Sequence, residues 1–175
     1  MSKKEQSRDI QHSRDSVDEL VKALRFEFTD IGVSATADLL YEQAPVTCNV
    51  VVAGLPYTGD AIHGEYSGAE MFTVIPGHIH APMENHTCSV SARDIGFLRF
   101  QGGTDAVEGD RVASEIAWFY GDYAMPSMRD GPIAMNIFAR FDQHNWEKFA
   151  EACGSVKPGE GRPVRITAVP HGEAG

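Results

Sequence analysis

The start of the chain alternates apolar and polar residues with a period of two, over two stretches joined by a short turn. Leu24, Phe26 and Phe28 alternate with polar neighbours, and after a turn at residues 30–32 a second alternating stretch covers residues 33–40. A period of two is typical of a half-buried β-strand, and two such runs joined by a short turn predict a β-hairpin. We therefore expect this chain to be built from β-strands from its first core residues onward.

A short helix is predicted directly after this hairpin. Pro45 suits the first turn of a helix, where its missing N–H is not needed, and Gly54 followed by Pro56 ends the helix. The interior of this segment is rich in valine, which has a weak intrinsic preference for helix. Packing must therefore hold the helix, and we expect it to cover an open end of a barrel.

The rest of the chain supplies the remaining strands and one more helix. Strands are predicted at residues 61–66, 71–74, 95–100, 114–120, 135–141 and 164–169. A second helix is predicted at residues 143–152, with Asp142 as its N-cap and Gly154 as its stop. Eight short strands with a helix near each end of the chain fit a closed barrel better than a doubly wound sheet.

The predicted fold class is therefore mainly β, a closed eight-stranded antiparallel barrel with two helices. Residues 20–175 form one barrel domain in this interpretation, and residues 1–19 form a flexible polar tail with almost nothing to bury.

Composition narrows the class of partner. The chain has 175 residues, a net charge of −10 and a pI near 5.0, which argues against nucleic acid or an anionic membrane as a partner. No stretch approaches the roughly 20 apolar residues of a membrane span, and the first residues do not resemble a secretory signal. We expect a cytoplasmic protein, with no cofactor, that binds a small molecule or a short peptide, with homo-oligomerisation left open.

Residues 44–49 read A-P-V-T-C-N, close to the A-P-x-T-x-x-N of cyclophilins, and together with the strand pattern they resemble the cyclophilin fold. More closely, the chain resembles a family of uncharacterised bacterial and archaeal proteins, a domain of unknown function with a cyclophilin-like fold. That resemblance is carried by residues 61–68, 94–97, 116–121 and 136–140, and it covers about residues 24–169. It implies a fold and no established activity.

One alternative function is a peptidyl-prolyl isomerase with a non-standard site. Cyclophilins carry F-H-R on the third strand, and the matching residues here are Ile62, His63 and Gly64. The glycine replaces the arginine that polarises the prolyl amide, so the largest electrostatic contribution to catalysis is missing. The resemblance therefore argues against isomerase activity, and whether the protein is an enzyme stays open.

The segment at residues 120–132 is interpreted as a long loop between strands, rich in aromatic, Met and charged residues. Long loops on a rigid barrel are where ligands usually bind. Arg129 would clamp a carboxylate or a phosphate. Asn136 and Arg140 follow on the next strand, where they either extend this site or lie on the solvated face of the strand.

His63 and Glu65 fall on one face of a predicted strand, where the pair could serve acid–base chemistry. The alternative is a histidine whose bonds are satisfied within the barrel. The predicted ligand-binding residues are His63, Glu65, Tyr120, Met125, Arg129, Asn136 and Arg140.

Two further alternatives come from other classes of protein. His78 and His80 would point to one face of an extended segment, and with His63 they could serve a metal-dependent enzyme. The simpler interpretation is a polar loop whose histidines face water, and no metal ligand is assigned. A purely structural or subunit role is the last alternative.

Overall fold

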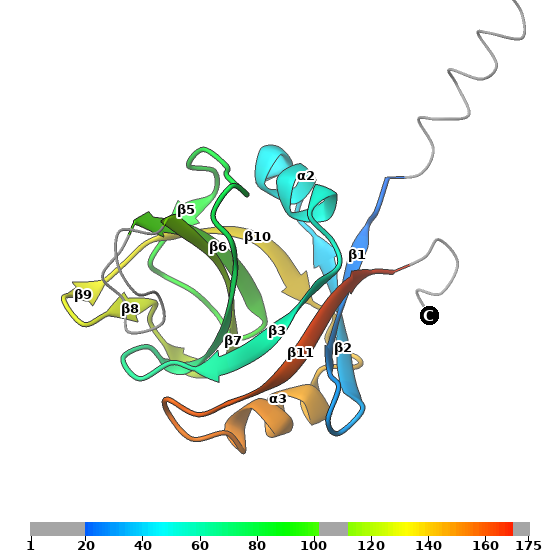
Figure 1. Ribbon diagram of the computed structural model, residues 1–175, viewed down its shortest axis with the longest axis vertical. Helices are drawn as coiled ribbons and strands as arrows, with labels where there is room; N and C mark the ends of the chain where they lie inside the picture. The colour runs from blue at the N-terminus through cyan, green and yellow to red at the C-terminus, as the bar shows by residue number, and fades with distance from the viewer. Residues whose placement is uncertain (1–19, 102–111, 170–175) are drawn as a thin grey trace, which may run out of the picture.

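The computed structural model describes residues 20–101 and 112–169 (Figure 1), so the tail predicted at residues 1–19 lies outside the described part. The strands are β1 (Ala23–Phe28), β2 (Val33–Leu39), β3 (Tyr57–His63), β4 (Gly68–Pro76), β5 (His86–Thr87), β6 (Asp94–Gln101), β7 (Val112–Ala124), β8 (Ser127–Met128), β9 (Gly131–Pro132), β10 (Met135–Phe141) and β11 (Gly161–Ala168). The described helices are α2 (Pro45–Ala53) and α3 (Glu147–Gly154).

Eight of these strands form a closed antiparallel barrel. They are hydrogen-bonded in the order β2-β1-β11-β3-β4-β7-β6-β10, and β10 pairs with β2 to close the ring. The short β5 adds to β10, while β8 and β9 form a separate two-stranded hairpin that projects from the barrel (Figure 1). The prediction of a mainly β, closed eight-stranded barrel with two helices is confirmed.

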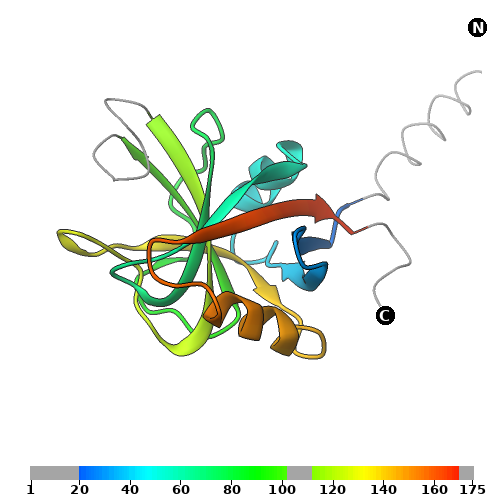
Figure 2. The same cartoon turned by 60° about the horizontal axis from the view of Figure 1, so that its bottom comes forward.

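The core of the barrel is aromatic. Phe26 meets Trp118 edge to face at 5.4 Å between ring centroids, and Phe28 stacks on Phe149 of α3 at 4.5 Å. The two helices lie on opposite sides of the barrel (Figures 1 and 2). On the α2 side, the hydroxyl of Tyr57 donates to the carbonyl of Val51. Each helix is thus held by packing on the barrel, as expected for α2 from its valine-rich sequence.

The second helix starts later than predicted. The segment at 143–152 was expected to be helical with Asp142 as the N-cap, but α3 spans Glu147–Gly154 and the residue at its N-cap is Trp146, which makes no side-chain capping bond. The carboxylate of Asp142 instead accepts a hydrogen bond from the backbone N–H of His144 at 3.1 Å. Asp commonly bonds to the backbone two residues on, which forms a turn, and this turn delays the helix.

The prediction of a long loop at residues 120–132 is wrong for residues 120–124. Strand β7 continues to Ala124, because β4 stays paired with it down to Gly68 across a register shift. Gly68 permits this approach, since a Cβ there would collide with the carbonyl oxygen of Tyr123. Most of the rest of the segment is the β8–β9 hairpin, whose Gly131 has φ +123°.

Within the described residues, no helix is long and apolar enough to cross a membrane.

Candidate functional site

A cavity of about 500 Å³ lies against the side of the barrel that is formed by β3, β4 and β7, next to the β8–β9 hairpin. Its lining comes from five places: the end of β3 with the β3–β4 turn, the outer face of β4 and β7, the β8–β9 hairpin, the segment from Ile133 to the start of β10, and the turn between α3 and β11. The lining residues are Ile62, His63, Gly64, Glu65, Tyr66, Ser67, Glu70, Phe72, Glu115, Ser127, Met128, Arg129, Asp130, Ile133, Met135 and Gly159.

Strand geometry explains how the cavity obtains polar groups from a barrel wall. Alternate residues of a strand face opposite sides of the sheet. The side facing the barrel core is apolar, with Met71, Ile75, Ile116 and Trp118. Phe72 and Ala117 belong to a second, smaller apolar cluster on the other side, and Glu70 and Glu115 follow the same alternation. Both carboxylates therefore lie on the outer side of the wall, where the cavity is.

Glu70 and Glu115 are buried although they carry carboxyl groups. Their exposed fractions are 5% and 7%, and neither has an ion-pair partner among residues 20–101 and 112–169. Burial raises the pKa of Glu70 to about 7, partly offset by a hydrogen bond with Ser67. Burial, and then the negative charge of Glu70, raises the pKa of Glu115 well above its usual range. A group that titrates near neutral pH inside a cavity, as Glu70 does, can take up and release protons.

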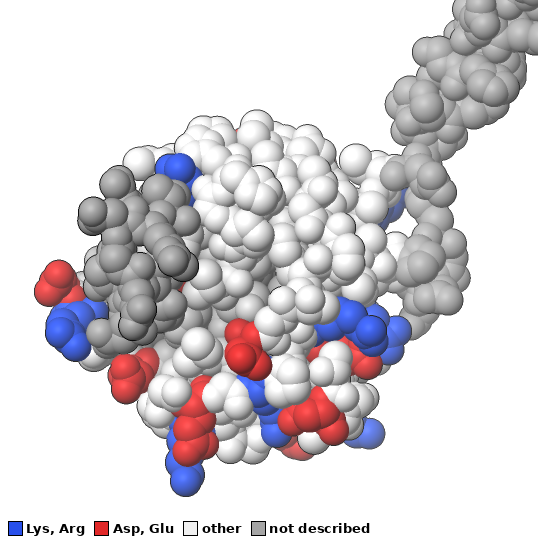
Figure 3. Space-filling model, in the orientation of Figure 1, with Lys and Arg blue, Asp and Glu red and all other residues white. Residues whose placement is uncertain are grey.

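The described lining of the cavity is acidic. Within residues 20–101 and 112–169, four carboxyl groups line it, those of Glu65, Glu70, Glu115 and Asp130, together with one guanidinium, that of Arg129. Arg129 and Asp130 are exposed at the tip of the β8–β9 hairpin, whereas Glu70 and Glu115 are buried on the wall. On the face of the molecule shown in Figure 3, charged residues of both signs lie mainly over the lower half and few lie over the upper half near α2. A negatively charged cavity favours positively charged ligands.

His63 has protein partners at both ring nitrogens. Nδ1 lies 2.8 Å from the carbonyl oxygen of Gly64, and Nε2 lies 2.6 Å from the hydroxyl of Tyr120. A carbonyl only accepts, so Nδ1 carries the proton, and in the neutral ring Nε2 accepts from the Tyr120 hydroxyl. Burial, and then the nearby Cys153, raises the pKa of Tyr120. His63 lines the cavity, but its hydrogen bonds are already made within the barrel.

Gly64 follows His63 at the end of β3, and the structure shows what a side chain would meet there. A Cβ on Gly64 would lie 3.2 Å from Oε1 of Glu70, which is closer than most real Cβ contacts. The buried carboxylate of Glu70 thus lies directly beside the backbone of Gly64.

Asn136 lies in a different polar cluster, near the start of α2. Its Oδ1 accepts from the backbone N–H of Glu84 and from Nδ1 of His86, and its Nδ2 donates to Thr47 and to the carbonyl of Pro82. Every hydrogen-bonding position of this amide is used, so the side chain holds three segments together.

The predicted ligand-binding residues are only partly brought together. His63, Glu65 and Arg129 line the cavity, and Tyr120 contacts His63. Met125 is 53% exposed and is not among the lining residues.

Arg140 lies in a cross-strand ion pair, with its Nε 2.8 Å from the carboxylate of Asp94. It is absent from the cavity lining, as are Asn136 and Tyr120.

Sequence reasoning missed Glu70 and Glu115. Glu115 stands in an otherwise apolar strand, and Glu70 directly precedes the predicted strand that begins at Met71. A carboxylate within an apolar strand was the available signal. The apolar neighbours indicate that the strand is buried, and acidic residues are rarely buried without a partner.

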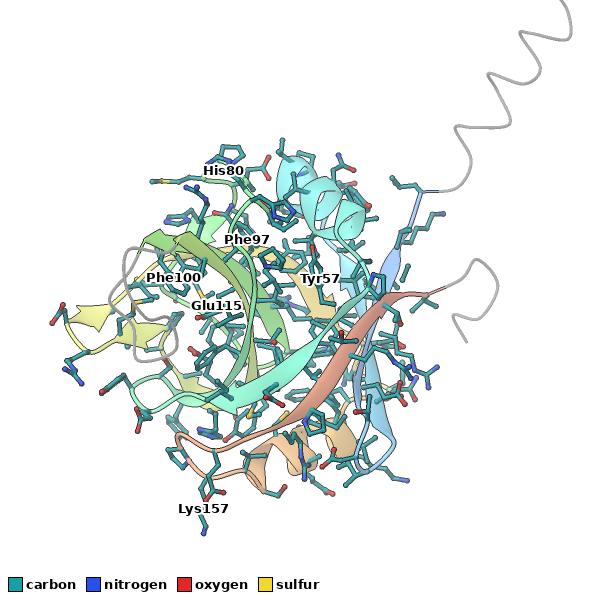
Figure 4. The ribbon with its side chains drawn as sticks, viewed as in Figure 1. Tyr57, His80, Phe97, Phe100, Glu115 and Lys157 are labelled. Atoms are coloured by element: carbon teal, nitrogen blue, oxygen red, sulfur yellow. The ribbon has the colours of Figure 1, made fainter. Side chains whose placement is uncertain are left out.

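The structure does not assemble the metal site considered for His63, His78 and His80. His63 is buried, while His78 and His80 are exposed. Figure 4 shows His80 at the upper edge of the molecule and Glu115 inside it. Across the part of the chain that the structure describes, no group of three or more His, Cys, Asp or Glu side chains is placed to hold a metal ion.

The fold and cavity define a closed antiparallel β-barrel with a carboxylate-lined cavity on its outer wall. The chain belongs to the family described as protein of unknown function DUF3830, whose sequence model matches residues 27–168. The search among curated proteins found no match.

Two solved structures share the fold. The structure of McbB in complex with tryptophan has a TM-score of 0.60 and 17% identity, over 87% of this chain and 46% of the McbB chain. This chain thus spans less than half of McbB. The solution structure of the hypothetical protein AF2241 from Archaeoglobus fulgidus has a TM-score of 0.51 and 18% identity, over 87% of this chain and 98% of the other. The predicted resemblance to a family of unknown function is therefore confirmed, whereas the resemblance to the cyclophilin fold stays a prediction, because neither structure is described as a cyclophilin.

Proposed function

We propose that the protein binds a small organic molecule in the cavity beside β4 and β7. A volume of about 500 Å³ falls in the range of small-molecule sites, roughly 300–1,000 Å³. The lining combines apolar side chains such as Phe72 and Ile133 with a few buried polar groups, which is the usual composition of such sites.

The observation that carries this proposal is the burial of Glu70 and Glu115 on the cavity. Removing a carboxylate from water costs several kcal/mol unless it is paired or neutralised. No ion pair among the described residues offsets that penalty. A ligand that contacts the carboxyl groups would offset it, which gives these residues a purpose that folding alone does not supply. McbB, similar in fold alone, was solved with the amino acid tryptophan, a molecule of the size proposed here.

A thermal-shift screen of the full chain against a broad set of metabolites tests the proposal. A ligand at 100 times its dissociation constant stabilises the folded state by about 2.7 kcal/mol, which a melting curve resolves. We expect at least one compound to raise the melting temperature of the wild type.

A variant that fills the cavity distinguishes binding there from binding elsewhere. Ile133→Trp enlarges a lining residue and is expected to abolish the shift. Ile31→Trp, in the exposed β1–β2 turn, is the matched control and should keep it. A shift that survives in Ile133→Trp, or a screen without any stabilising compound, would contradict the proposal. Circular dichroism of both variants without ligand establishes that each is folded.

A further inference from the structure

We propose that the ligand is an organic amine, whose one or two protonated amino groups pair with the carboxylates of Glu70 and Glu115 and whose apolar body packs on Phe72. This inference rests on the proposed function, because it names the chemical class of ligand for the same cavity.

The sign of the charge in the cavity is the first argument. Among the residues that the structure describes, four carboxyl groups and one guanidinium line it, and the two buried carboxyl groups lie on the barrel wall rather than on the exposed hairpin. Glu70 and Glu115 are only 5% and 7% exposed. Both line the same cavity, and neither has an ion-pair partner among the described residues. An anionic ligand would add charge of the same sign next to them. A cation relieves both.

The kind of cation follows from the ligands that the site offers. Calcium takes six to eight oxygen ligands and magnesium requires near-octahedral coordination. The described residues contain no group of three or more candidate ligands. An ammonium group needs fewer ligands, because its three N–H groups donate hydrogen bonds that two carboxylates can accept.

The apolar part of the ligand follows from the register of β4 and β7. Phe72 pairs with Ala117, Glu70 pairs with Phe119, and Glu115 pairs with Val74. The Phe72–Ala117 pair therefore lies between the two carboxylates along the outer face of the wall. Ala117 is small, and Met135 and Ile133 add apolar surface to this part of the molecule. A hydrocarbon chain or ring attached to the amine would lie on this surface.

Binding of an amine is expected to release protons. Part of the Glu70 population carries a proton near neutral pH, since burial raises its pKa to about 7, and burial shifts the pKa of Glu115 in the same direction. The amine binds the ionised form of each group. The other titratable or charged groups on the cavity are His63, Glu65, Tyr66, Arg129 and Asp130. For an alkylamine that stays protonated, affinity should rise between pH 6 and pH 8, and the Glu70→Gln variant isolates the share due to Glu70.

Isothermal titration calorimetry of the full chain with four matched probes tests the inference: hexylamine, 1,4-diaminobutane, 1-hexanol and hexanoate. We expect an amine to bind, with the alcohol and the carboxylate at least tenfold weaker. Glu70→Gln and Glu115→Gln should each weaken amine binding at least tenfold. Glu151→Gln, which removes the same charge from the exposed surface of α3, should leave it within twofold.

The outcomes separate this inference from the proposed function. If hexanol or hexanoate binds, and Ile133→Trp blocks it, while amines do not bind, the cavity is a ligand site and the amine assignment is wrong. If amines bind equally to wild type and to the Glu115→Gln and Glu70→Gln variants, the carboxylates are not the counter-ions and the inference fails. If Mg²⁺ or Ca²⁺ competes with the amine and binds more tightly, the site is a cation site of another kind. If no probe binds and the metabolite screen is also negative, both proposals fail.

Discussion

Two polar clusters in this barrel, each centred on buried side chains, behave in opposite ways. The amide cluster consists of Asn136 with Thr47, Pro82, Glu84 and His86, and all the hydrogen-bonding positions of Asn136 are used within it. The carboxylate cluster consists of Glu70 and Glu115, which have no ion-pair partner among the described residues and face a cavity.

The pKa values follow the same division. Burial acts on Glu84 too, but hydrogen bonds from Thr47 and from the backbone of Val46 outweigh it, so the pKa of Glu84 is lowered. In the carboxylate cluster burial dominates and the pKa is raised. A polar cluster that satisfies itself supports the fold, whereas one left incomplete beside a cavity is suited to a ligand.

The largest expected effect is on the amide cluster. Asn136→Ala removes a buried amide and leaves the hydroxyl of buried Thr47, the partly buried N–H of Glu84 and the carbonyl of Pro82 without this partner. Each buried group left unsatisfied costs roughly 1–3 kcal/mol. We expect the free energy of unfolding to fall by about 4 kcal/mol, measured by urea denaturation. Asn49→Ala, at an exposed position of α2, is the control. A loss below about 1 kcal/mol would show that the cluster does not hold the fold.

The carboxylate cluster should make the protein less stable as the pH rises. The unfolded carboxyl group of Glu70 titrates at 4.5 and the folded one at about 7, so between these values the folded state holds a proton that the unfolded state has lost. The free energy of unfolding therefore falls as pH rises through this window, by about 3 kcal/mol, and the loss is complete above pH 7. The difference between wild type and Glu70→Gln in urea titrations from pH 4.5 to 8 measures it. A difference independent of pH would refute the raised pKa.

The contribution of Glu84 to the free energy of unfolding should depend on pH in the opposite direction and should be smaller. Its carboxylate accepts hydrogen bonds from the backbone N–H groups of Val46 and Thr47 at the start of α2, where a negative charge is stabilising. Glu84→Gln should cost about 1.5 kcal/mol at pH 7. Because the folded pKa is lowered, this contribution is present above pH 4.5 and disappears as pH falls through the folded pKa. Glu42→Gln, at an exposed position just before α2, is the control, and equal losses in the two variants would contradict the capping role.

The smallest effect on stability is expected at Tyr120, which contacts a residue of the cavity but does not line it. Tyr120→Phe removes the hydrogen bond to Nε2 of His63 and should cost about 1 kcal/mol, because the phenyl ring still packs on the core. Since Tyr120 does not line the cavity, the affinity for a cavity ligand should change less than twofold in calorimetry. A tenfold loss of affinity would place Tyr120 in the site and extend the site toward α3.

Much of the fold was predictable because its signals are local. The alternation of Leu24, Phe26 and Phe28 predicted β1, and these residues are fully buried. Pro45 and Gly54 bound the first helix, and α2 has those limits. Asp142 misled the prediction of α3, because the same side chain suits both an N-cap and a turn, and only the surrounding chain selects between them.

The amino-acid sequence by itself determined the strand pattern and the helix limits at Pro45 and Gly54, since each depends on neighbours within a few residues. It also determined the acidic balance of the chain, which is a matter of composition alone. Only the tertiary structure decided which polar residues form a site. Asn136 and Arg129 looked alike as candidates, yet Asn136 is enclosed by residues 47 and 82–86 while Arg129 lies on the cavity. Glu70 and Glu115 share a cavity because β4 and β7 pair in one register. Burial is a non-local property, set by which strands pair and what covers them, and burial is what gives these two carboxylates their chemistry.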